Sequence, residues 1–268
     1  MHNDLEHSTR TLHGNSRMPR RAVMRCAAVV ALLLGAALVL GAAQAESAWE
    51  TLKQQYLQAS RAEHDARIAS WREVAAWSFD TNSMPEAFHV YEGEWEVVDG
   101  ELRAVAGDPD RNRTIRIADC RWPAFRLEFD VALHPREGAP PDRVGDVGIR
   151  FNADRETGGF ADGYAMITAQ YANQATVFYR LNVPYARTEW SPIEPGRRHR
   201  VALEVVKPHV RLWVDGRVVL DAWERAGDNN RDHRDFLDMD PQRALVLHTY
   251  DTVMAIDNLR ISVPADDD

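Results

Sequence analysis

The stretch Arg211-Leu-Trp-Val-Asp-Gly-Arg-Val-Val-Leu220 alternates apolar and polar side chains on both sides of Asp215-Gly216. An Asp-Gly pair accepts the positive φ angles of a two-residue type I′ turn, so this stretch predicts a tight β-hairpin. A second Asp-Gly pair, Asp99-Gly100, separates two shorter runs with the same alternation. Both hairpin signals indicate a domain built from antiparallel strands.

Period-two alternation continues along the chain to residue 263, with turn-forming residues between the runs. This pattern is typical of an all-β, two-sheet antiparallel β-sandwich. The predicted strands cover residues 94–98, 101–105, 114–117, 125–131, 147–152, 164–170, 176–182, 200–206, 210–214, 218–222, 244–249 and 255–263.

The first 45 residues have the pattern of an export signal. Three arginines at positions 20, 21 and 25 precede an uncharged run over 26–43, and Ala43-Gln-Ala45 is a small-residue cleavage site. A retained anchor is the alternative, because 18 uncharged residues approach the minimum that spans a bilayer. We expect a periplasmic or extracellular protein without stable membrane association after cleavage.

The chain divides into four predicted parts. Residues 1–45 form the signal peptide, with Met18 as an alternative start. Residues 46–75 form a helical segment, because apolar side chains recur there at three-to-four spacing without Gly or Pro. Residues 76–264 form the sandwich, and residues 265–268 form an acidic tail.

The net charge limits which classes of partner the protein can bind, and the cysteine content limits whether a disulfide can stabilise it. The first 45 residues hold five of the 32 basic and two of the 41 acidic residues, so the remainder has a net charge of −12. This charge argues against nucleic acid and anionic membranes as partners, whereas a neutral sugar is compatible with it. Cys26 lies in the signal, so Cys120 remains alone and is expected to be a buried, inert thiol.

Several pieces of the predicted strands occur in a characteristic order. They are Gly93-Glu-Trp-Glu-Val-Val-Asp-Gly100, Phe125-Arg-Leu-Glu-Phe-Asp-Val131, Gly148-Ile-Arg-Phe-Asn152 and Asp257-Asn-Leu-Arg260. Together with the hairpin at Asp215-Gly216, they resemble the concanavalin A-like lectin and glucanase group over residues 76–263, closest to its laminin-G-like and 3-keto-disaccharide-hydrolase-like members. The resemblance implies a jelly roll, but this fold carries binding modules, hydrolases and lyases alike.

A retaining glycosidase of the laminarinase type needs two Glu and an Asp on one strand, in the order E-x-D-x-x-E. Glu128-Phe-Asp130 begins such a run, but Leu133 stands where the second glutamate would be. The sequence therefore excludes that mechanism at this strand. A polysaccharide lyase remains open, because a Tyr or His base and polar groups for a substrate carboxylate are present.

Candidate ligand-binding residues come from strands expected to share one sheet face and from an aromatic loop. Period-two geometry places Arg150 and Asn152 opposite the apolar Val147, Ile149 and Phe151. Planar polar side chains and exposed aromatic rings are the groups that bind sugars. The predicted set is Arg150, Asn152, Gln170, Tyr179, Arg180, His248, Tyr250 and Trp190.

Calcium is a candidate cofactor, because many proteins of the resembled group carry one away from the concave sheet face. Asp80, Asn82 and Asp257 could supply oxygen ligands where the first and last strands meet. The chain has no His/Cys cluster for zinc and no phosphate-binding glycine loop.

The sequence thus predicts an exported β-sandwich that engages a carbohydrate on its concave sheet face. Two alternatives stay open. One is an enzyme on the same face, either a glycoside hydrolase resembling the 3-keto-disaccharide group or a polysaccharide lyase. The other is a protein-interaction domain.

Overall fold

The computed structural model describes residue 62 and residues 70–105, 112–142, 144–223 and 237–265. The predicted signal peptide, the helical segment up to residue 69 and the tail from residue 266 lie outside the described residues. Within the part of the chain that is described, no helix is long and apolar enough to cross a membrane.

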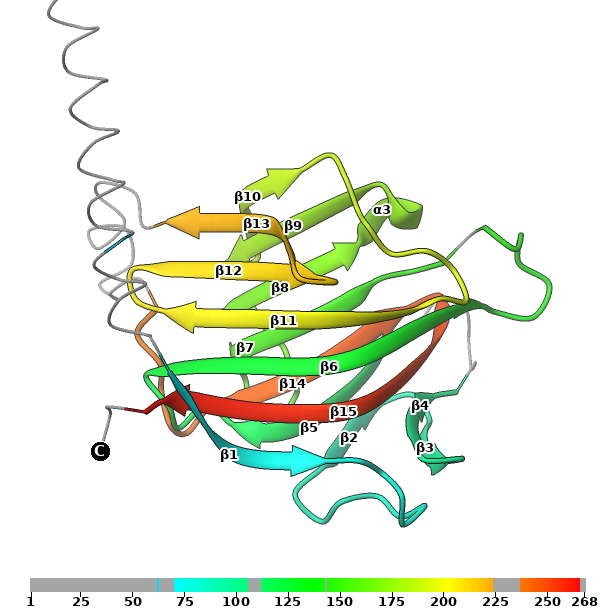
Figure 1. The fold of residues 1–268 in the computed structure, drawn as a ribbon, viewed down its shortest axis with the longest axis horizontal. Helices are drawn as coiled ribbons and strands as arrows, with labels where there is room; N and C mark the ends of the chain where they lie inside the picture. Colours follow the sequence, from blue (N-terminus) through cyan, green and yellow to red (C-terminus); the bar gives the residue numbers. More distant parts are fainter. Residues whose placement is uncertain (1–61, 63–69, 106–111, 143, 224–236, 266–268) are drawn as a thin grey trace, which may run out of the picture. The chain divides into compact units, whose positions relative to one another are not determined.

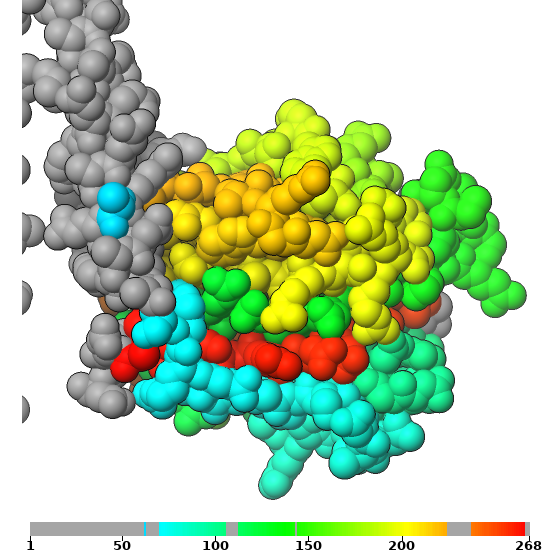
Figure 2. All heavy atoms as spheres, in the orientation of Figure 1, coloured from blue at the N-terminus to red at the C-terminus, as the bar shows by residue number. Residues whose placement is uncertain are grey.

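The first sheet has eight antiparallel strands in the order β13-β12-β11-β6-β15-β4-β3, with β1 paired to β15 (Figure 1). Figure 2 shows β1, β15, β6 and the β11–β13 strands side by side on its outer face. The strands are β1 (Trp71–Trp77), β3 (Trp95–Val98), β4 (Glu101–Ala104), β6 (Ala124–Pro135), β11 (Arg198–Val206), β12 (His209–Val214), β13 (Arg217–Trp223) and β15 (Thr252–Pro264).

The second sheet has seven antiparallel strands in the order β10-β9-β8-β7-β14-β5-β2 and lies behind the first (Figure 1). A short turn, α3 (Gln170–Asn173), joins β8 to β9. The strands are β2 (His89–Glu92), β5 (Asn112–Asp119), β7 (Val147–Ala153), β8 (Tyr164–Ala169), β9 (Ala175–Arg180), β10 (Val183–Thr188) and β14 (Ala244–Tyr250).

The main core lies between the two sheets and is made by alternate residues of their strands. Phe125 and Phe129 of β6 point into it from one sheet, and Phe151 and Phe178 point into it from the other. Phe151 stacks on Tyr164, with ring centroids 5.2 Å apart. The two-sheet antiparallel sandwich predicted from the alternation is confirmed.

Both Asp-Gly hairpins are confirmed. Asp215 and Gly216 have φ angles of 50° and 74°, and Asp99 and Gly100 have 53° and 76°. These are the two successive positive φ angles that a type I′ turn requires.

The boundary between the predicted helix and the sandwich is wrong. Residues 71–75, placed in the helical segment, belong to strand β1, so the sandwich begins at Trp71 rather than at residue 76. Trp71 pairs with Pro264 and Trp77 pairs with Leu259, and the register shifts between Glu73 and Ala75. This segment forms a strand because it pairs with β15. Strand formation depends more on the neighbouring strand than on the local sequence pattern.

Cys120 is 1% exposed, and its Sγ accepts a hydrogen bond from the backbone N–H of Asn152 at 3.1 Å. Burial raises the pKa of this thiol to about 12. We expect iodoacetamide at pH 8 to leave Cys120 unmodified in the folded protein and to alkylate it fully in urea, because the thiolate is the reactive form. Mass spectrometry of the tryptic peptide checks this, and fast labelling of the folded protein would contradict it.

Candidate functional site

The outer face of the seven-stranded sheet carries buried polar groups in its middle. In register across β5, β14 and β7 lie Thr114, His248 and Gly148, and the neighbouring row contains Val246 and Arg150. Arg150 is 8% exposed and His248 is 2% exposed. This face therefore holds a guanidinium and an imidazole that are not part of the core between the sheets.

The absence of a side chain at Gly148 makes room for His248. A Cβ added at Gly148 would lie 1.7 Å from Cε1 of the imidazole, so the ring lies directly across this glycine. Glycine in a strand interior often marks such a close approach.

The loop between β7 and β8 lies over Arg150. The Nη1 of Arg150 donates to the carbonyl oxygen of Gly158 at 3.1 Å, and its guanidinium lies 5.2 Å from the centre of the Phe160 ring. Phe160 in turn packs edge-on against Tyr179. The guanidinium is thus held in one position.

Asp146, just before β7, is the third titratable group of this cluster. Its Oδ2 lies 3.9 Å from Nε2 of His248. Burial raises the pKa of Asp146 to about 7, although the charge of Arg150 and the backbone N–H of Tyr250 act in the opposite direction. Burial, with the nearby Arg150 charge, holds the pKa of His248 well below its usual range, so the imidazole is neutral.

Four buried polar atoms of this cluster have no hydrogen-bond partner among the described residues: Asp146 Oδ1, Arg150 Nε, His248 Nδ1 and Thr114 Oγ1. Buried polar side chains are paired in the large majority of cases, and an unpaired one costs about 1–3 kcal/mol. Pairing these four atoms would require water or polar groups from outside the described residues. We call Asp146, Arg150, His248 and Thr114 the polar cluster.

A cavity of about 420 Å³ reaches the polar cluster at Asp146. Two of its lining residues are partly exposed tyrosines, Tyr171 at 52% and Tyr250 at 40%. The complete lining is Val144, Gly145, Asp146, Ala169, Gln170, Tyr171, Ala172, Tyr250 and Asp251. We call this space the Asp146 cavity.

Backbone strain is concentrated around the Asp146 cavity. Ala169, Tyr171, Ala172 and Asp251 have φ angles of 60°, 56°, 55° and 51°. Left-handed backbone costs roughly 1–2 kcal/mol per non-glycine residue, and bulky residues adopt it rarely. Such strain persists where the surrounding structure imposes it, often at ligand sites.

Gly145 closes one side of the Asp146 cavity, and any side chain there would collide with the backbone. An added Cβ would lie 1.5 Å from the carbonyl oxygen of Tyr250. We expect Gly145→Ala to lower the free energy of unfolding by about 2 kcal/mol or more, measured by urea denaturation. Gly159→Ala is the control, since its Cβ would meet only Thr157 Oγ1 at 3.2 Å. Equal stability of the two variants would contradict this geometry.

The structure divides the predicted ligand residues into four places. Gln170 and Tyr250 line the Asp146 cavity. Arg150, His248 and Tyr179 lie on the outer face beside it, and Tyr179 exchanges hydrogen bonds with Gln170 at 2.8 and 3.0 Å. Trp190 lines a different cavity.

Asn152 and Arg180 lie at the opposite end of the sheet from the Asp146 cavity. Asn152 has a φ of 54°, and its side chain holds the backbone of Asp238 and Asp240 at 3.2 and 2.9 Å. Arg180 is paired in register with Tyr164 and shares the core-facing side, because neighbouring Tyr179 takes the outer side.

Each of the three residues expected to bind calcium accepts a hydrogen bond from a neighbouring group. Asp80 accepts a hydrogen bond from Ser78, Asn82 accepts one from Gly100, and Asp257 accepts one from the backbone of Asn258. No group of three or more His, Cys, Asp or Glu side chains suited to a metal ion occurs in residues 70–105, 112–142, 144–223 and 237–265.

Asp146 is the functional candidate that the predicted set lacks. It stands two residues before Gly148 and four before Arg150, so the same period-two alternation places all three on one face. This spacing could have predicted Asp146 as a site residue from the sequence. Tyr171 had no such signal, because its position depends on the left-handed turn α3.

Solved structures share the two-sheet sandwich fold of this domain. One comes from work on endo-acting O-glycanases with which human gut bacteria initiate mucin breakdown (13% identity, 73% of this chain and 100% of that chain, TM-score 0.54). Another is the mannose- and Ca²⁺-bound exoplasmic domain of VIP36 (9%, 74% and 93%, 0.53). A third is a Bacillus subtilis protein of unknown function with a galectin-like fold (11%, 72% and 99%, 0.51).

The family model of the 3-keto-alpha-glucoside-1,2-lyase-like domain matches residues 69–262. The chain belongs to this family, which confirms the resemblance seen in the strand motifs. A search of curated proteins found no sequence match.

Proposed function

We propose that this domain binds a carbohydrate in the Asp146 cavity, on the outer face of the seven-stranded sheet. The observation that carries the proposal is the polar cluster, with four unpaired buried atoms beside a cavity that two exposed tyrosines line. Sugars stack on aromatic rings and hydrogen-bond through planar polar groups. Mannose in the VIP36 structure and the glycan-directed O-glycanases support this ligand class.

Binding to a glycan array tests the proposal. We expect Asp146→Asn and Tyr171→Ala each to weaken the strongest glycan signal at least about tenfold, with the affinity then measured by calorimetry. Asp142→Asn, an exposed carboxylate outside the cavity, is the matched control and should bind as the wild type does. Wild-type affinity in both cavity variants would contradict the proposal.

A second candidate function is elimination at a 3-keto-α-glucoside, favoured by the pKa of Asp146 at about 7. A general base works best with a pKa near the working pH. In such a sugar the C2 proton is acidic because C3 is a carbonyl. The Asp146 carboxylate would take that proton, the C1–O bond would break as C1=C2 forms, and the departing oxygen would receive the proton.

The chromogenic substrate 4-nitrophenyl 3-keto-α-glucoside tests this chemistry. We expect kcat/KM to rise with pH through about 7, where Asp146 becomes deprotonated, and to fall about 10²–10⁴-fold in Asp146→Asn. If no 4-nitrophenol is released while glycans still bind, the domain is a binding module.

The place of action is proposed to be the periplasm or the extracellular space. The basic, apolar and small-residue pattern over residues 20–45 supports export, as does the ligand class proposed above.

A further inference from the structure

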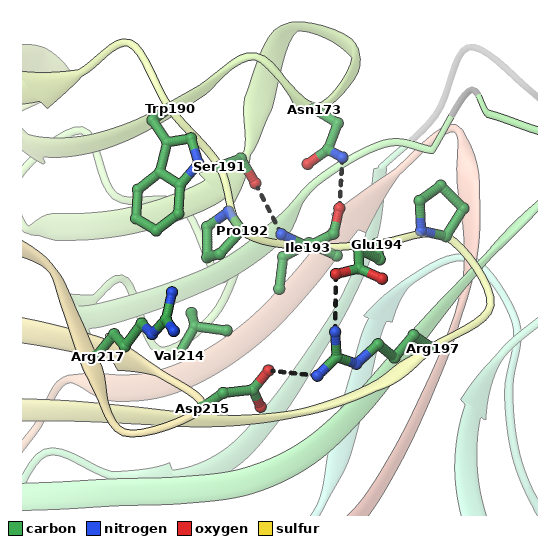
Figure 3. Close-up of a pocket in the computed structure, with 11 residues that line it drawn as sticks. Asn173, Trp190, Ser191, Pro192, Ile193, Glu194, Arg197, Val214, Asp215 and Arg217 are labelled. Carbon is green, nitrogen blue, oxygen red and sulfur yellow. Dashed lines mark hydrogen bonds and ion pairs between the residues drawn. The ribbon is translucent and has the colours of Figure 1, made fainter.

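A second cavity, of about 620 Å³, lies between the loop that follows β10 and the β12–β13 hairpin turn (Figure 3). Its lining is Asn173, Trp190, Ser191, Pro192, Ile193, Glu194, Pro195, Arg197, Val214, Asp215 and Arg217. We call it the Trp190 cavity. It shares no lining residue with the Asp146 cavity, although α3 supplies Asn173 to one and Gln170, Tyr171 and Ala172 to the other.

The loop that carries Trp190 is held in place without the indole ring. Ile193 is 1% exposed and anchors the loop in the core, and its carbonyl oxygen accepts a hydrogen bond from Asn173 Nδ2. The hydroxyl of Thr176 donates to the carbonyl of Trp190 at 3.1 Å, and Glu194 N–H donates to buried His199 Nε2 at 2.9 Å. The Trp190 side chain, 46% exposed, is therefore free to meet a ligand on a preorganised backbone.

The charged groups of the Trp190 cavity compensate one another. Arg197 bridges Glu194 at 2.7 Å and Asp215 at 3.6 Å, as Figure 3 shows. Asp215 also accepts a hydrogen bond from His199 Nδ1 at 2.8 Å. Within the described residues no carboxylate pairs with exposed Arg217, so this guanidinium retains its donors. Two arginines and two carboxylates leave the lining neutral.

One acceptor in the Trp190 cavity is also unused. The Nδ2 of Asn173 donates a hydrogen bond to the carbonyl oxygen of Ile193, whereas its buried Oδ1 has no partner among the described residues. Among the described residues, the cavity thus offers an exposed indole, a guanidinium with no carboxylate partner and a buried amide oxygen with no donor.

We propose that the Trp190 cavity is a second carbohydrate site, which takes a neutral pyranose unit. The apolar face of the sugar would stack on Trp190, while its hydroxyls would accept hydrogen bonds from Arg217. The lining as a whole carries no excess of positive charge, so it gives a uronate no net electrostatic advantage over a neutral sugar. Two separate sites on one domain would bind one polysaccharide multivalently, with a higher overall affinity than either site has alone.

The test is an NMR titration of the ¹⁵N-labelled full-length protein with maltotriose, cellotriose and, as an anionic comparison, trigalacturonic acid. A neutral trisaccharide should shift the Trp190 indole signal and the amides of residues 191–197. Trp190→Ala and Arg217→Ala should each weaken this binding at least tenfold. Val218→Ala, which removes an exposed apolar side chain next to Arg217, is the matched control and should leave it unchanged. Equal unfolding midpoints confirm that the variants fold.

Asp146→Asn separates this inference from the proposed function. Shifts at the Trp190 cavity that persist in Asp146→Asn support the second site, even if the Asp146 cavity binds nothing. Shifts confined to the Asp146 cavity, or no shifts at millimolar sugar, overturn it. Tighter binding of trigalacturonic acid than of the neutral sugars at this cavity overturns the assignment to a neutral unit.

Discussion

Asp146→Asn is expected to make stability fall steeply as pH drops below about 6.5, where the wild type is less sensitive to pH. In the wild type the pKa of Asp146 is raised from 3.8 to about 7, so the folded state holds a proton that the unfolded state has released between these values. Stability from this group is therefore present below about pH 4 and is lost as pH rises to about 7. One pKa unit corresponds to about 1.4 kcal/mol, which sets an upper bound on the order of 4 kcal/mol.

The contribution of His248 to stability depends on pH in the opposite direction. Its pKa is lowered well below 6.5, so the unfolded state takes up a proton as pH falls through 6.5 and the folded state does not. Stability from His248 is full above pH 6.5 and is lost below it. Below pH 6.5 the two groups act in opposite directions, so their contributions to the pH dependence offset each other in the wild type.

Single variants should separate the two contributions. Between pH 6.5 and 5, Asp146→Asn should lose roughly 1.4 kcal/mol per pH unit, whereas His248→Gln should gain a similar amount. Urea denaturation at pH 5, 6, 7 and 8 measures both slopes. Parallel profiles for the wild type and the two variants would show that neither group is buried in the state described.

The sequence predicted the strands well because two local rules agree over most of the chain. Asp-Gly pairs need positive φ angles, and period-two alternation matches sheets with one buried face. The alternation rule failed at residues 71–75. These residues have apolar side chains at helical spacing, but they form a strand because they pair with β15. The rule also missed β2 and β10, which lie at the two edges of the seven-stranded sheet.

The site was predictable only where strand alternation continues. Arg150 and His248 share a face as expected, because β7 and β14 are regular over those positions. The turn at α3, Gln170-Tyr-Ala-Asn173, contains no glycine, so its composition does not predict its left-handed backbone. The positive φ of Asn152 within β7 likewise lay outside the alternation rule, and its side chain bonds to residues 238 and 240, far along the chain.

Arg150→Met is expected to be much more destabilising at pH 8 than at pH 5. The carboxylates whose charges act on Arg150 are Asp146 first and Glu92 second. Above pH 7 the loss of the guanidinium leaves a buried carboxylate without its counter-charge, at about 3–5 kcal/mol. At pH 5 Asp146 is protonated, so the loss is limited to the hydrogen bond to Gly158 and the contact with Phe160.

The double variant Asp146→Asn/Arg150→Met isolates the charge effect. At pH 8 it should recover about 2 kcal/mol or more of the stability that Arg150→Met loses, and the coupling between the two positions should shrink at pH 5. Arg200→Met, which removes an exposed guanidinium bridged to Glu128 at 3.3 Å, is the control and should change stability by less than about 1 kcal/mol. If Arg150→Met is equally destabilising at both pH values, Arg150 acts by packing alone. Persistent glycan binding by the folded Arg150→Met protein would then assign Arg150 to the support of the site rather than to contact with the sugar.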